Sequence, residues 1–130
     1  SFSSLKATVL HIFDAETIWL NRLNREPITG WPSKDFQGSD TEMIQGWLAK
    51  SSELENWVEA KDEENFNNRL EYRNMAGDKF EQEVWQIVLH VCNHSTYHRG
   101  QLVTILRNID KGMKLPATDL IYYWRAQENK

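Results

Sequence analysis

The longest helical pattern in the chain covers residues 84–109. Its apolar residues follow a seven-residue repeat, at Val84, Val88, Val91, Leu102, Ile105 and Ile109. Polar residues interrupt or flank this stripe near its middle, namely His90, Asn93, His94, Tyr97, His98 and Gln101. The pattern therefore predicts a long helix with polar chemistry at its centre.

Three further stretches have helical spacing, and each can be opened by a residue whose side chain accepts hydrogen bonds from the first turn. They run from a cap at Ser3 or Ser4 to about Asn24, from a cap at Asp40 or Thr41 to about Asp62, and, after Thr118 and Asp119, from Leu120 to Ala126. Pro27, Gly30 and Pro32 break regular structure between the first two. The chain should thus be mainly helical.

The stretch from Phe66 to Phe80 lacks a helical period, and apolar residues flank the turn-forming residues 74–78. We interpret it as a short β-hairpin or paired loop before the last long helix. The fold class is then all-α, with residues 1–130 forming a single helical-bundle domain. Three long helices and one short one make an incomplete four-helix bundle, so we expect either that residues before Ser1 are absent or that the tail or a second chain completes the bundle.

The composition excludes several classes of function. The net charge of -4 comes without any run of basic residues, so nucleic acid is not expected as a partner. No stretch approaches the roughly 20 apolar residues of a membrane span, and no signal peptide is recognisable. The single cysteine, Cys92, should be a small buried side chain, which fits a reducing cytoplasm.

His94 and His98 are four residues apart, so on a helix their imidazoles lie one above the other and can reach one metal ion. A third donor must come from another helix, and His11 is the best candidate because it lies in the middle of the first helix. Three imidazoles leave coordination positions open, as in catalytic zinc sites. Zinc, nickel, manganese and iron all accept imidazole, so the ligand type does not choose among them.

Other polar residues near this site could assist its chemistry. Asp14 or Glu16 could orient a histidine or accept a proton from bound water, and Tyr97 and Gln101 are weaker candidates for substrate contacts. The alternative is that all the histidines are half-buried residues satisfied by hydrogen bonds within a bundle. His90 extends the row by one turn, but we interpret it as structural or supporting, because a fourth ligand would crowd the site.

Several segments of the chain resemble the DinB family of damage-inducible-type metalloproteins. The similarity lies in four segments: His94-Ser95-Thr96-Tyr97-His98-Arg99-Gly100-Gln101 with the preceding residues 89–93, residues 11–20, residues 70–80 and residues 116–123. The resemblance implies a four-helix bundle, frequently a homodimer, with a divalent ion held by His11, His94 and His98. It also implies that the family's usual first helix precedes Ser1.

Two functions are consistent with these observations. In the first, the chain uses one divalent ion, zinc or nickel ahead of manganese or iron, as a thiol transferase or hydrolase acting on a small-molecule substrate. In the second, it is a non-catalytic, metal-binding, stress-response module that dimerises through its aromatic surface.

Overall fold

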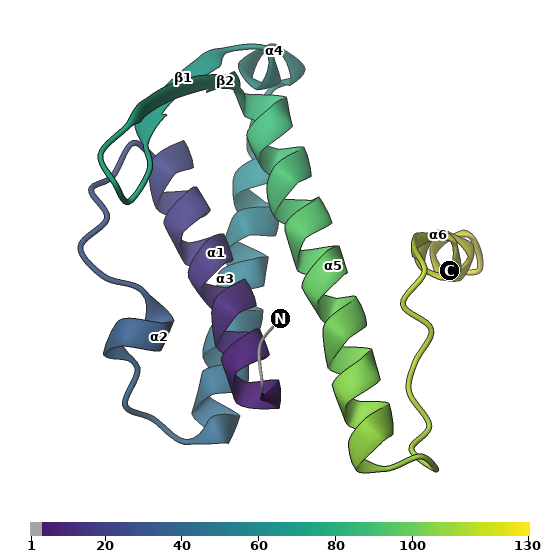
Figure 1. The fold of residues 1–130 in the computed structure, drawn as a ribbon. Coiled ribbons are helices and arrows are strands. Elements are labelled where there is room, and N and C mark those ends of the chain that lie inside the picture. The colour runs from purple at the N-terminus through teal and green to yellow at the C-terminus, as the bar shows by residue number, and fades with distance from the viewer. Residues whose placement is uncertain (1–3) are drawn as a thin grey trace.

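A computed structural model describes residues 4–130 of the chain. Three long helices form its body: α1 (Leu5–Leu23), α3 (Asp40–Glu59) and α5 (Val84–Ile109). Both α3 and α5 pack against α1, which is the central helix of the body (Figure 1). The all-α fold expected from the sequence is confirmed for the described residues.

Helix α1 begins where the sequence predicts. The Ser4 side chain accepts a hydrogen bond from the backbone N–H of Ala7 and caps the first turn, and Asn24 caps the other end. The alternative cap, Ser3, lies outside the described residues. The buried residues of α1 recur every three or four positions, as one helix face requires: Thr8, Val9, Ile12, Phe13, Glu16, Leu20 and Leu23.

Helix α3 is capped one residue earlier than expected. The Ser39 hydroxyl accepts from the Glu42 N–H, while the Glu42 carboxylate accepts from the Ser39 N–H. This reciprocal pair satisfies two N–H groups that the helix itself leaves free, which explains why Ser39 is preferred over Asp40 or Thr41. The helix ends at Glu59, and a separate short helix, α4 (Glu63–Phe66), follows.

Helix α5 buries a narrower stripe than the heptad pattern suggests, namely Val84, Ile87, Val91, Ser95 and His98. Ile109 is 68% exposed, because the last turns of α5 extend beyond the other long helices (Figure 1). Cys92 falls outside the buried stripe and is exposed, so the expectation of a buried thiol is wrong.

The β-hairpin is confirmed. Strands β1 (Arg69–Arg73) and β2 (Lys79–Glu83) pair antiparallel, with Tyr72 opposite Phe80. The turn is closed by Asn74, whose side-chain oxygen accepts from the Asp78 N–H, and Gly77 takes a left-handed φ of 92° that favours glycine. Leu70, 2% exposed, anchors the hairpin in a cluster with Leu23, Val84 and Ile87.

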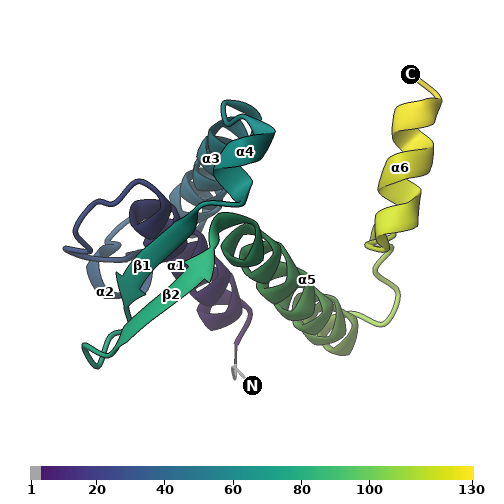
Figure 2. The same cartoon turned by 90° about the horizontal axis from the view of Figure 1, so that it is seen from above.

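The last helix, α6 (Leu120–Glu128), stands apart from the three long helices (Figure 2). All its residues are exposed, including the aromatic run Tyr122, Tyr123 and Trp124. The sequence predicted helix α6, but α6 does not complete the bundle.

A short helix, α2 (Pro32–Asp35), lies in the loop beside α1. Among the described residues no helix is both long and apolar enough to cross a membrane.

Candidate metal centre

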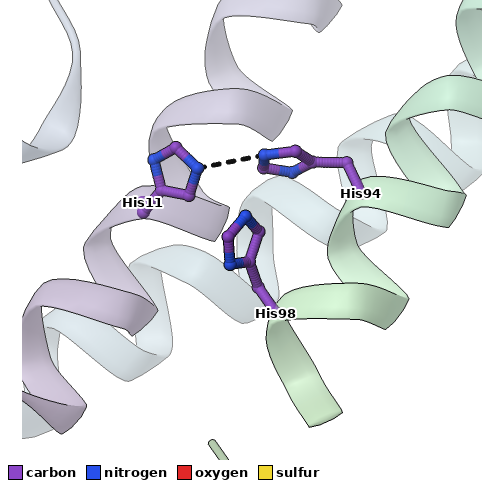
Figure 3. A group of neighbouring side chains, drawn as sticks. All are labelled: His11, His94 and His98. Atoms are coloured by element: carbon purple, nitrogen blue, oxygen red, sulfur yellow. Dashed lines mark hydrogen bonds between the residues drawn. The ribbon is translucent and has the colours of Figure 1, made fainter. Parts of the chain in front are cut away.

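Three histidines meet between α1 and α5. His11 comes from α1, and His94 and His98 come from successive turns of α5 (Figure 3). One ring nitrogen from each lies within 4.8 Å of the others. The structure thus brings together the three residues that the sequence analysis selected, from positions far apart in the chain.

The spacing of these nitrogens is close to what a metal ion needs. His11 Nε2 and His94 Nε2 are 3.0 Å apart, and the His98 ring centre lies 4.5 Å from each of the other two ring centres. An ion bound about 2.1 Å from two imidazole nitrogens separates them by roughly 3–3.5 Å in tetrahedral geometry. Small side-chain rotations therefore suffice to place one ion among the three rings.

A buried network holds α1 and α5 in the register that this meeting requires. Glu16, on α1, is 4% exposed and accepts hydrogen bonds from Ser51 on α3 (2.6 Å) and from Ser95 on α5 (3.4 Å). Ser95 lies between His94 and His98 in sequence. Glu16 therefore joins all three long helices, and its carboxylate is engaged there; it does not line the pocket beside the histidines.

Burial favours the neutral form of the His94 and His11 imidazoles. Burial, followed by the charges of His98, His11 and His90, lowers the pKa of His94 to about 4. Burial and then His98 also lower the pKa of His11, against an opposing effect of Asp14. A neutral imidazole offers the lone pair that a metal binds, so the electrostatics favour ligation over protonation near neutral pH.

The outward nitrogens of the rings differ in their surroundings. His98 Nδ1 lies 2.7 Å from Gln101 Oε1, so a proton on Nδ1 would be donated to the amide and Nε2 would be left as the ligand atom. His94 Nδ1 is buried and makes no hydrogen bond with the described residues. A polar atom buried without a hydrogen bond is costly.

His90 does not join the cluster. Its ring packs edge-on against Trp19 at 5.2 Å and lies 5.9 Å from the His94 ring. It lines a different pocket, with Trp19, Tyr72, Gln82, Gln86 and Ile87. The interpretation of His90 as a supporting residue agrees with this position.

An open pocket of about 360 Å³ adjoins the histidines. His11 and His94 lie in its wall together with Asp14, Ala15, Ile18, Trp19, Arg22, Trp31 and Met75. Asp14 Oδ1 accepts from the Ser33 N–H at 2.7 Å, which ties the loop carrying Trp31 to α1. Tyr97 is 65% exposed, with its ring 5.0 Å from that of His98.

Residues 1–130, which include the three histidines on α1 and α5, match the DinB family. The chain belongs to the DinB family. The match covers every residue of the chain, so the segments that resembled DinB belong to one continuous similarity. Comparison with curated proteins and with solved structures gives no significant match.

Six residues that line the pocket in this DinB chain were not predicted from the sequence: Ala15, Ile18, Trp19, Arg22, Trp31 and Met75. Arg22 could have been found, because it lies on the helix face of His11 by its spacing. Trp31 and Met75 come from a loop and from the hairpin turn, and no periodic pattern relates either of them to His11.

Proposed function

We propose that this DinB-family chain is a metal-dependent enzyme that acts on a small molecule, as a thiol transferase or a hydrolase. One observation carries the proposal: three imidazoles with two lowered pKa values converge beside an open pocket. Three protein ligands are the number found in catalytic zinc sites, where a further position is left for substrate or water.

His11, His94 and His98 would hold the ion, and Gln101 would orient His98. A divalent ion bound there supplies Lewis acidity, which lowers the pKa of a coordinated water or thiol. Asp14 lines the same pocket one helical turn from His11, so we assign it the proton that the substrate or water gives up. The apolar walls formed by Ile18, Trp19 and Trp31 would exclude competing water.

We expect one ion per chain, with zinc and nickel ahead of manganese and iron. Imidazole nitrogen suits all four metals, and the donor set alone supports no choice among them. The single cysteine is consistent with a reducing compartment, so the cytoplasm remains our expectation for the location.

The experiment is a turnover screen of the zinc-loaded and nickel-loaded protein. Low-molecular-weight thiols are paired with electrophiles in one arm, and small esters and amides are offered in the other. We expect turnover in one arm, lost in His98→Ala and retained in His90→Ala. No turnover in either arm, with a metal whose coordination the protein saturates, would contradict an enzyme.

A second candidate is a non-catalytic, metal-binding module that dimerises through an aromatic surface. Helix α6 favours it, because Tyr122, Tyr123 and Trp124 are 51%, 58% and 54% exposed. Sedimentation of the full chain and of a chain ending at Asp119 tests this candidate. A dimer that becomes a monomer on shortening supports it, and a full chain that is monomeric at all concentrations contradicts it.

A further inference from the structure

Arg22 lines the same pocket as His11 and His94, which we call the metal pocket after the proposed ion. It follows His11 by eleven residues, which is about three turns of α1, so the two side chains share one helix face. Asp14, Ala15 and Ile18 lie between them on that face and line the same pocket. A molecule in the pocket therefore touches the histidines at one end and Arg22 at the other.

The Arg22 guanidinium is held in a fixed orientation. It stacks over the ring of Trp19 at 4.3 Å and lies 5.1 Å from the ring centre of Tyr72. One terminal nitrogen, Nη2, donates to the Arg73 backbone oxygen at 3.0 Å. Because the group is already ordered, a ligand that binds it loses little additional side-chain entropy.

This cation has no anionic partner among the described residues. The ion pairs present there involve other cations: Lys6, Lys50, Arg69 and Lys79. Arg22 Nε is buried without a hydrogen bond, and burial lowers the pKa of the guanidinium, although Tyr72 opposes this. Buried and half-buried cations are usually paired, so an unpaired arginine in a pocket wall is an available site for an anion.

The surroundings of Arg22 are also cationic. A second hollow, of about 510 Å³, shares Arg22 and Met75 with the metal pocket and is lined by Arg25 and Arg73 as well. Two carboxylates lie in its wall, Glu26 and Glu71, but Glu71 is paired with Lys79 at 2.7 Å. The wall around Arg22 thus holds three arginines, and Glu26 is its one carboxylate outside the four ion pairs named above. The local charge therefore favours an anion.

We propose that the substrate carries an oxyanion, a carboxylate or a phosphate, at the end remote from the metal, and that Arg22 binds this group. The inference rests on the proposed function, because it assumes that the other end of the substrate reaches the three-histidine site. The planar guanidinium fork matches both oxyanions. Between the two ends the wall is largely apolar, with Ala15, Ile18, Trp19, Trp31 and Met75, so the connecting part of the substrate is apolar.

The length of the substrate follows from helix geometry. Eleven residues advance about 16 Å along the axis. The Arg22 guanidinium stacks over Trp19, which precedes it by three residues, and this brings it closer to His11. A two-carbon molecule cannot span this separation, whereas a chain of several methylene groups can. Affinity should therefore depend on chain length when both ends are engaged.

The test uses the zinc-loaded full chain and calorimetry with ω-mercaptocarboxylates from mercaptoacetate to mercaptoundecanoate. Each acid is compared with the ω-mercaptoalcohol of the same length, and a third series carries a terminal phosphate. In the wild type we expect the acid to bind about tenfold more tightly than the alcohol once the chain is long enough. The phosphate series shows which oxyanion is preferred.

Two variants localise this effect. Arg22→Gln should reduce the acid-to-alcohol affinity ratio by about tenfold for long chains, and Arg22→Lys should restore part of it. Lys61→Gln is the matched control, since Lys61 is a cation stacked over Trp57 at 4.9 Å and does not line the pocket. It should leave the ratio unchanged.

The outcomes separate the inference from the proposed function. Zinc that does not bind overturns both. Zinc that binds without accepting any thiol overturns the thiol-transferase form of the proposed function and, with it, the inference that a metal-bound thiol reaches Arg22. If zinc and thiols bind, but the acid-to-alcohol affinity ratio is the same in wild type and Arg22→Gln, only the role of Arg22 is overturned. Its stacking is then purely structural. If Arg22→Gln does not fold, the wild type alone tests the inference. An acid-to-alcohol affinity ratio that does not change with chain length then overturns the role of Arg22.

Discussion

His11 Nε2 lies 3.0 Å from His94 Nε2, although the two residues are 83 positions apart in the chain. The contact joins the centre of α1 to the centre of α5 and depends on how these helices pack. Glu16, through Ser51 and Ser95, is the polar group that connects them inside the core. The stability of the bundle and the geometry of the site therefore share one network.

Ser51→Ala should destabilise the bundle. The substitution removes the 2.6 Å hydrogen bond to Glu16 and leaves one carboxylate oxygen of a buried side chain without that donor. We expect the free energy of unfolding to fall by about 1–3 kcal/mol, measured with urea. Ser52→Ala, at an exposed position of the same helix, is the control. Equal effects of the two substitutions would show that the Glu16 network contributes nothing.

Gln101→Ala should weaken metal binding without removing a ligand. Gln101 Oε1 lies 2.7 Å from His98 Nδ1 and would fix the ring so that Nε2 faces the ion. Loss of such a partner costs about 10- to 100-fold in metal affinity, which competition with a chelator measures. Thr104→Ala, on an exposed turn of the same helix, should leave the affinity unchanged. An unchanged affinity in Gln101→Ala would mean that packing alone orients His98.

The metal-free protein should lose stability on acidification between pH 6.5 and pH 4, because the pKa of His94 is lowered from 6.5 to about 4. Within this interval the unfolded chain binds a proton at this residue more readily than the folded chain does. The free energy of unfolding therefore decreases as the pH falls. His11 contributes in the same direction.

Urea unfolding of the metal-free protein at several pH values in this interval measures the effect. The comparison with His94→Gln separates it from the carboxylates that titrate in the same range. The variant should show a shallower dependence on pH. Identical slopes in both proteins would mean that His94 titrates normally in the folded state.

The sequence predicted the long helices and the hairpin because each is specified locally. Ser4 caps α1, and Asn74 and Gly77 form the hairpin turn by their own conformational preferences. The buried face of α5 was less predictable. Which side of a helix is covered depends on its neighbours, and here they cover Ser95 and His98 while leaving Cys92 and Ile109 exposed.

The meeting of the three histidines was predictable from the sequence, but most residues of the adjoining pocket were not. The spacing of His94 and His98 and the central position of His11 are properties of individual helices. Trp31 and Met75 reach the pocket through tertiary packing of a loop and a turn, which helical periodicity does not describe. The placement of Glu16 in the core, away from the pocket, likewise depends on where Ser51 of α3 packs.

The central claim is that His11, His94 and His98 bind one divalent ion, and metal analysis of the purified protein tests it most directly. After incubation with zinc or nickel and removal of excess metal, we expect about one ion per chain, as a single three-histidine site requires. His11→Ala and His98→Ala should lose the ion, and His90→Ala should keep it. A wild-type protein without metal, or a loss confined to His90→Ala, would contradict the account.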